Sequence, residues 1–264
     1  MRNVVIMAML IMSFLNADNT NKLGMYEAIG TQAPLDLHFT DENGKDVTLR
    51  QLADGRPLLL TLNYYVCSGI CSPQLNELAL TLEQMKLKEG LDYKVVTVSI
   101  NDAEGPAIAT QKKKNHIDSI NREFDESSWS FLVGNTENIE TLAKAVGFYY
   151  EKIVSDTGVV DFIHPSALIS ISPTGKICRY LNGIKQNPFD VKLAVYEAAQ
   201  EKTGPSIAKI VNYCFSFDPA SKKYVVDFER IIGIVMSLML FGFLAYLIIT
   251  GRKDSNYKKG EENE

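Results

Sequence analysis

The sequence predicts an α/β fold, and three observations support this assignment. Nearly continuous apolar runs at residues 58–65 and 95–100 are typical of strands buried on both faces. Apolar residues at helical spacing follow the first run over residues 73–85, and Gly90 is placed to cap the end of that helix. A hairpin is expected to precede a final helix at residues 188–202. Strands that alternate with helices and end in a hairpin plus a helix predict a sheet of thioredoxin type.

The remaining elements follow from shorter patterns. Alternating residues around the turn-rich segment 41–44 predict an N-terminal β-hairpin over residues 35–49. We expect an exposed helix at 104–122, where the lysines of residues 112–114 would form a solvated face. The other expected elements are a strand at 129–133, a helix at 136–146, a hairpin at 148–160, and paired strands at 166–171 and 176–181. The prediction is therefore a thioredoxin-like fold with added N-terminal and mid-chain hairpins.

Size and composition favour a single folded domain over residues 21–203. The chain has 264 residues, of which 46% are hydrophobic, enough to bury one full core. The formal net charge of -5 provides no broad basic surface, which argues against nucleic acid as a partner. Four cysteines are too few for a scaffold held together by disulfides.

Both ends of the chain carry membrane signals. Residues 1–20 are predicted to be a signal peptide, because Arg2 precedes an apolar run and small residues near Ala17 form a plausible cleavage site. An uncleaved N-terminal anchor is the alternative. Residues 229–251 are predicted to form a transmembrane helix, since the uncharged stretch 231–250 matches the roughly 20 residues needed to cross a bilayer.

These signals predict a single-pass protein of the cell membrane. Basic residues in the tail, residues 252–264, favour a cytoplasmic C-terminus. The main domain would then lie on the extracytoplasmic (periplasmic) side, joined to the membrane helix by a juxtamembrane segment at residues 204–228.

Two cysteines stand where chemistry is expected. Cys67 and Cys71 lie four residues apart between a buried strand and a helix. A helix N-terminus stabilises thiolates, so we expect lowered pKa values there. At helical spacing the two Cα atoms would be about 6 Å apart, which allows either a disulfide or a metal ion between the sulfurs. Thiolates prefer soft metals such as Cu(I), and two of them require a further ligand.

The chain has three histidines, and one of them is the best candidate for that ligand. His38 and His116 are expected to be solvated or capping residues. His164 precedes a predicted buried strand, and in thioredoxin-like folds the loop entering that strand packs beside the cysteine turn. A histidine that only forms hydrogen bonds is the alternative. Together with Cys67 and Cys71, His164 would suit three-coordinate Cu(I), or Cu(II) with an added donor, whereas a closed zinc site lacks a fourth ligand.

The arrangement of these motifs resembles the Sco/SenC family. The Cys-x-x-x-Cys motif follows a buried strand, and the downstream histidine precedes Ile-Ser-Pro-Thr-Gly-Lys at residues 171–176. The resemblance covers residues 33–202, and residues 212–219 before a membrane helix resemble the branch of that family with a C-terminal membrane anchor. It implies a copper metallochaperone that binds the ion with Cys67, Cys71 and His164. It also implies delivery of copper to, or reduction of the thiols of, the binuclear copper centre in cytochrome c oxidase subunit II.

The chain departs from the family pattern at several positions. Ser68 and Ser72 stand where relatives tend to carry proline. Asn101 and Asp102 occupy the place of an Asp-Pro pair after the second buried strand, and neither is assigned a role.

The two cysteines also suggest functions other than metal binding. In a thiol-disulfide oxidoreductase, Cys67 would attack and Cys71 would resolve, although three intervening residues instead of two favour metal. A thiol peroxidase would need a threonine where Tyr64 and Tyr65 stand. Cys178 is expected to be a small buried hydrophobe, while Cys214 could be buried, could be a spare thiol near the membrane or could receive copper.

Overall fold

The computed structural model describes residues 23–67, 69–155, 158–204, 215–218 and 223–226, with residues 236, 239 and 243. The chain divides into two compact units, Met1–Gly204 and Pro205–Glu264. In the second unit, strands β12 (Phe215–Asp218) and β13 (Lys223–Val226) pair antiparallel.

The predicted membrane signals fall largely outside the described residues. The signal peptide at 1–20, nearly all of the membrane helix at 229–251 and the tail at 252–264 are not described. Cys214 also lies outside the described residues. Among the residues that are described, none belongs to a helix with the length and apolar character needed to cross a bilayer.

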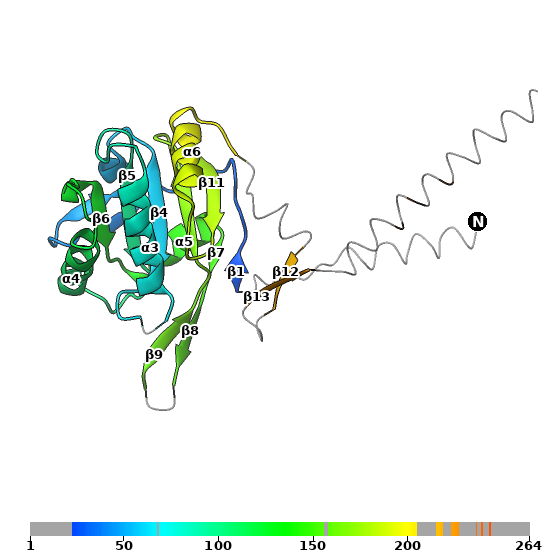
Figure 1. Ribbon diagram of the computed structural model, residues 1–264. Helices are drawn as coiled ribbons and strands as arrows, with labels where there is room; N and C mark the ends of the chain where they lie inside the picture. Colours follow the sequence, from blue (N-terminus) through cyan, green and yellow to red (C-terminus); the bar gives the residue numbers. More distant parts are fainter. Residues whose placement is uncertain are drawn as a thin grey trace, which may run out of the picture. The chain divides into compact units, whose positions relative to one another are not determined.

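A five-stranded mixed sheet forms the centre of the first unit, in the order β11-β10-β4-β5-β6 (Figure 1). The parallel strands are β4 (Leu58–Asn63), β5 (Lys94–Ser99) and β6 (Trp129–Leu132). Two antiparallel strands, β10 (Ala167–Ile171) and β11 (Ile177–Asn182), complete it beside β4. The predicted α/β sheet of thioredoxin type is therefore confirmed.

Helices cover both faces of the sheet. One face packs against α3 (Cys71–Gln84), α4 (Pro106–Ile117) and α6 (Pro188–Ala199). The opposite face packs against α2 (Leu49–Ala53) and α5 (Thr136–Ala145). The sheet is thus the middle of three layers, which explains why its strands are nearly continuous apolar runs.

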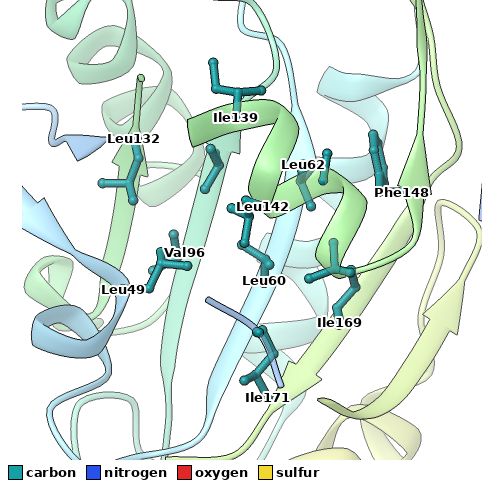
Figure 2. Close-up of a cluster of buried hydrophobic side chains, with 14 of the residues drawn as sticks. Leu49, Leu60, Leu62, Val96, Leu132, Ile139, Leu142, Phe148, Ile169 and Ile171 are labelled. Carbon is teal, nitrogen blue, oxygen red and sulfur yellow. The ribbon is translucent and has the colours of Figure 1, made fainter. Parts of the chain in front are cut away.

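Strand β4 supplies both cores because successive side chains of a strand point to opposite faces. Leu60 and Leu62 pack with residues of α5 in one cluster (Figure 2), and Leu59 packs with residues of α3 and α6 in the other. All three leucines are buried. The two clusters therefore fix β4, and with it the segment that follows β4, on both sides.

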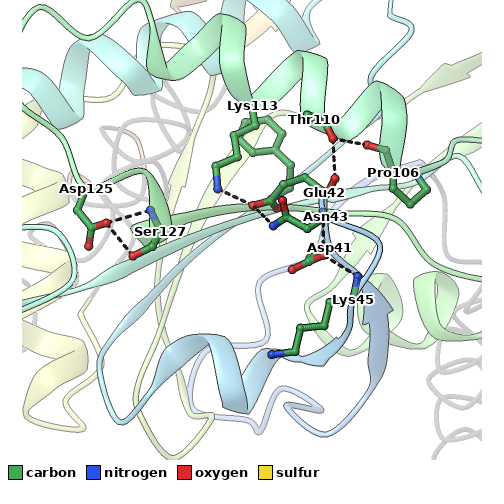
Figure 3. A network of polar contacts seen from close by, with 10 residues as sticks. Asp41, Glu42, Asn43, Lys45, Pro106, Thr110, Lys113, Asp125 and Ser127 are labelled. Carbon is green, nitrogen blue, oxygen red and sulfur yellow. Dashed lines mark hydrogen bonds and ion pairs between the residues drawn. The ribbon is translucent and has the colours of Figure 1, made fainter.

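The N-terminal hairpin consists of β2 (His38–Thr40) and β3 (Asp46–Thr48), as predicted. Its turn is tied to α4 and β6 by Glu42, whose carboxylate pairs with Lys113 and accepts the backbone N–H of Phe131 (Figure 3). Lys113 is only 15% exposed, so the expectation that the whole lysine run is solvated is wrong for this residue.

The mid-chain hairpin is shifted relative to the prediction. Strand β7 (Phe148–Tyr149) pairs with β1 (Gly24–Met25) instead of starting the hairpin. The hairpin is formed by β8 (Glu151–Val154) and β9 (Val160–Ile163), which project away from the sheet (Figure 1). Its strands bury few side chains, so the apolar pattern did not mark their limits.

Two boundaries beside the cysteines also differ from the prediction. Strand β4 ends at Asn63 and not at residue 65, because Glu104 accepts the backbone N–H groups of Tyr65 and Val66. Helix α3 begins at Cys71, two residues before the predicted start. The described residues between them, 64–67 and 69–70, therefore form a loop.

Candidate metal centre

Cys67 and Cys71 lie where the chain passes from β4 into α3. Cys71 is the first residue of α3 and is buried, while Cys67 is half-buried in the preceding loop. The spacing predicted that the two residues share a helical turn. The structure shows that they do not, because Cys67 precedes the helix. Both side chains are free thiols.

His164 reaches this position from the loop between β9 and β10. Strand β10 runs antiparallel to β4, with Ile169 opposite Leu60, so the start of β10 lies beside the end of β4. His164 Nε2 is 3.0 Å from Cys71 Sγ. The ligand atoms of Cys67, Cys71 and His164 all lie within 4.8 Å of one another, close enough to hold a metal ion.

The hydrogen bond at Nδ1 of His164 leaves the other ring nitrogen, Nε2, available to bind a metal ion. Nδ1 is 2.8 Å from the backbone carbonyl oxygen of Pro165. Because a carbonyl oxygen can only accept, Nδ1 carries the ring proton and donates a hydrogen bond to that oxygen. In this tautomer Nε2 presents its lone pair to the cysteines. Burial lowers the pKa of His164, while the Pro165 carbonyl and Asp161 oppose that shift. The ring is therefore neutral at neutral pH, which is the form that binds metals.

The Cys71 thiol does not behave as the helix N-terminus predicted. Burial, followed by the neighbouring Cys67 sulfur, raises the pKa of Cys71 well above its usual value. The backbone N–H of Tyr64 and the side chain of Asn63 oppose this shift but do not outweigh it. A buried thiol without a counter-charge keeps its proton, and a bound cation would supply the missing positive charge.

Two residues that were not predicted as site residues support the cysteine loop. The Glu104 carboxylate accepts the N–H of Val66 at 2.7 Å and that of Tyr65 at 2.8 and 2.9 Å, and it also accepts the hydroxyl of Ser99 at 2.6 Å. The Tyr64 hydroxyl donates a hydrogen bond to the Asp161 carboxylate on β9. Burial and the Asp161 carboxylate raise the pKa of Tyr64 well above its usual value, so the phenol remains a donor.

The surface around the site is partly apolar. Val66 is 68% exposed and Ile70 38% exposed on either side of Cys67, and Ile163 is 45% exposed next to His164. The half-buried Cys67 sulfur thus lies at a surface, whereas Cys71 and His164 lie beneath it.

The other predicted candidates lie elsewhere. His38 is exposed and its Nδ1 is 2.8 Å from Asp46, in agreement with a solvated residue. The expectation for His116 is wrong, because it is 4% exposed and stacks on Trp129 and Phe131. Cys178 is buried, as expected.

Comparison with known proteins places this arrangement in a family. Residues 31–199 match the SCO1/SenC family. The SCO1 protein homolog of Bacillus subtilis (strain 168) is 28% identical over 153 residues, which cover 58% of this chain and 75% of that protein.

Solved structures show the same fold. The structure of Arabidopsis thaliana ScoI with copper bound has a TM-score of 0.52 at 19% identity, covering 66% of this chain and 99% of that one. A SCO1/SenC family lipoprotein from Bacillus anthracis str. Ames has a TM-score of 0.50 at 23% identity, covering 65% and 99%. Because the family match spans more than half of the sequence, this chain belongs to the SCO1/SenC family.

Proposed function

We propose that Cys67, Cys71 and His164 bind one copper ion and that the protein is a copper metallochaperone for cytochrome c oxidase assembly. The observation that carries the proposal is the convergence of two thiols and a neutral imidazole within 4.8 Å. The imidazole comes from a segment 93 residues away from Cys71.

The chemistry of these donors fits copper. Thiolate sulfur is a soft ligand and imidazole is an intermediate one, a combination that suits Cu(I) and accepts Cu(II) when another donor is added. Within the described part of the chain, the Cys and His cluster contains no fourth protein ligand, which disfavours a closed zinc site. The copper-bound structure of Arabidopsis thaliana ScoI, which has the same fold, supports this choice of metal.

The proposed recipient is the binuclear copper centre of cytochrome c oxidase subunit II. Cys67 is the ligand nearest to solvent, so a partner's ligands would reach the ion from that side. The exposed Val66 and Ile70 would contact the partner surface around it.

A thiol-disulfide oxidoreductase is the second candidate function, and the proximity of the two sulfurs favours it. The Cys67 thiolate would attack a partner disulfide, forming a mixed disulfide and releasing one partner thiol. Cys71 would then displace the second partner thiol. The partner disulfide is reduced while Cys67 and Cys71 are oxidised to a disulfide.

We also propose the cellular arrangement that the sequence predicts. The signal peptide at residues 1–20 would export the chain, and the helix at 229–251 would anchor it. The main domain would then face the extracytoplasmic side.

Copper retention tests the metal site. The full chain is reduced, loaded anaerobically with Cu(I), dialysed and analysed for metal. We expect about one copper per chain in the wild type and loss of tight retention in His164→Ala, because removing one of three ligands leaves an incomplete set. His38→Ala is the matched control and should retain copper, since His38 is exposed and pairs with Asp46.

The same variants separate the two candidate functions. Mass analysis after mild oxidation should show a disulfide between Cys67 and Cys71 in His164→Ala, because both thiols remain. If His164→Ala retains as much copper as the wild type, the proposed metal site is wrong and the oxidoreductase function takes its place.

A further inference from the structure

Two buried side-chain amides join the three segments that carry or adjoin the metal ligands. Asn63 is the last residue of β4, and Gln74 lies one turn of α3 after Cys71. Asn63 Nδ2 donates to Gln74 Oε1 at 3.0 Å, and Gln74 Nε2 donates to the backbone carbonyl oxygen of Ala167 at 3.1 Å. Ala167 begins β10, shortly after His164. These two hydrogen bonds form an amide bridge between β4, α3 and β10.

The amide bridge lies at the end of the sheet where the backbone pairing of β10 with β4 stops. The two strands pair over Ile169–Ile171 and Leu58–Leu60, so their described pairing ends before Ala167. The carbonyl oxygen of Ala167 accepts a hydrogen bond from the Gln74 side chain of α3 instead. Gln74 therefore takes over the connection between the two strands at the end where the ligands lie.

Both amides are held on rigid elements. Asn63 is 0% exposed and Gln74 is 1% exposed. The backbone carbonyl oxygen of Asn63 accepts the N–H of Ile100 at 2.7 Å, which ties it to the segment after β5. The backbone N–H of Gln74 donates to the carbonyl oxygen of Ile70 at 2.9 Å, in the first turn of α3. The amide bridge thus runs from the sheet, through the helix, to the strand that follows His164.

Stability alone does not explain a pair of amides in this place. Asn63 Oδ1 is buried, and no described residue forms a hydrogen bond with it. An unpaired buried oxygen costs stability, whereas two apolar side chains of the same shape can be neutral or stabilising. Hydrogen bonds, however, are directional and fix one spacing between the groups that they join. The pair is explained if that spacing matters to the neighbouring site.

We propose that Asn63 and Gln74 are positioning residues of the metal centre: the amide bridge sets the distance between Cys71 Sγ and His164 Nε2, which are 3.0 Å apart. The proposal rests on the copper site proposed above. Cys71 and Gln74 belong to one helix, and Ala167 closely follows His164, so a shift at the bridge moves one ligand relative to another. Groups that orient a ligand affect the affinity of the site for its metal.

Three variants of the full chain alter the amide bridge. Gln74→Leu removes both hydrogen bonds and leaves Asn63 Nδ2 and the Ala167 carbonyl oxygen without a partner. Asn63→Leu removes only the first bond. The double variant removes both bonds together with the unpaired Nδ2 group.

Thr81→Val is the matched control. Thr81 also lies on α3, and its buried hydroxyl also donates to a backbone carbonyl oxygen of a distant segment, that of Gln186 at 3.1 Å. It is about 15 Å along the helix from Cys71, so its loss should not move the ligands.

Two measurements use copper. In competition with a chromophoric Cu(I) chelator, Gln74→Leu should weaken copper affinity by about tenfold while about one copper per chain still binds. Asn63→Leu should change the affinity in the same direction. In the Cu(II) form, electron paramagnetic resonance should show weaker coupling to the His164 nitrogen in Gln74→Leu than in the wild type. Thr81→Val should change neither measurement.

Urea unfolding of the metal-free protein separates positioning from a general structural role. Gln74→Leu and Thr81→Val should both lower the urea midpoint, because each leaves a buried group without a partner. The double variant should regain part of the midpoint that Gln74→Leu loses, since the unpaired Asn63 Nδ2 is gone, but it should not regain copper affinity. Copper affinity that recovers with stability, or that is unchanged in Gln74→Leu, would overturn the proposal.

A further measurement is independent of copper. Hydrogen exchange of the metal-free protein, followed by mass analysis of the peptide containing residues 164–170, should be several-fold faster in Gln74→Leu than in the wild type or Thr81→Val. If the wild type binds no copper, the metal function fails, and this exchange alone decides whether the amide bridge holds the His164 segment. Unchanged exchange in Gln74→Leu would then refute the bridge as well.

Discussion

His164 and His116 are both buried, but their ring nitrogens have different neighbours. His164 donates from Nδ1 to a carbonyl oxygen and faces a sulfur with Nε2. Neither ring nitrogen of His116 has a hydrogen-bond partner among the described residues, and the ring stacks on Trp129 and Phe131. Burial, and to a lesser extent Lys112, lowers the pKa of His116 to about 4. His116 therefore behaves as an aromatic core residue that must remain neutral.

This burial predicts a loss of stability in mild acid. The ordinary pKa of His116 is 6.5, so between pH 6.5 and 4 the unfolded chain gains a proton that the folded chain does not. The free energy of unfolding should fall over this range, by roughly 3 kcal/mol at most. Urea unfolding at several pH values measures it.

His116→Phe is the test variant, because phenylalanine keeps the stacking and cannot take up a proton. It should show a smaller loss between pH 6.5 and 4 than the wild type, whereas the exposed His38→Ala should follow the wild type. Equal pH profiles for His116→Phe and the wild type would contradict this explanation.

At the scale of elements, the cysteine loop is held by a residue from the next strand connection. The parallel pairing of β4 and β5 places Ser99 opposite Asn63, so the segments after both strands leave the sheet at the same edge. Glu104, in the segment after β5, can therefore reach the loop and accept the N–H groups of Tyr65 and Val66. The Glu104 carboxylate thus accepts the two N–H groups that a neighbouring strand would accept within a sheet.

Glu104→Ala should destabilise the fold by about 2–4 kcal/mol, because it leaves buried donors without a partner. Asp102→Ala is the control: Asp102 is exposed and bonds Thr136 and Lys152, so its loss should cost less than about 1 kcal/mol. Chemical denaturation gives both values. Similar values for the two variants would show that Glu104 is not the support of the loop.

At the scale of the whole molecule, the proposed function depends on which side of the membrane the metal centre faces. A thiol reagent that cannot cross membranes should label Cys67 in intact cells, since this thiol is half-buried. In a Cys67→Ser, Cys214→Ser background, Ser255→Cys in the predicted cytoplasmic tail should be labelled only after lysis. The reverse pattern would place the domain in the cytoplasm and refute the proposed location.

The sequence predicted best those parts of the fold in which the order of apolar and polar residues follows the burial of their side chains. Strands β4 and β5 are apolar because helices cover both faces of the sheet, and this is visible in the sequence. The hairpin of β8 and β9 was misplaced because its side chains are mostly exposed.

The same distinction applies to the site. Cys67, Cys71 and His164 could be singled out because thiols and imidazoles are scarce in this chain and the cysteines share a motif. Glu104 and Tyr64 could not, because glutamate and tyrosine are common residues. Their roles depend on which loops meet at one edge of the sheet, which no local pattern records.

The pairing of β10 with β4 has a consequence for biosynthesis. The two thiols are made early, and the imidazole joins them only after β10 has been synthesised and has docked beside β4. A nascent chain therefore presents an incomplete set of the three ligands. Under the proposed function, full copper affinity would be reached only once the sheet has formed.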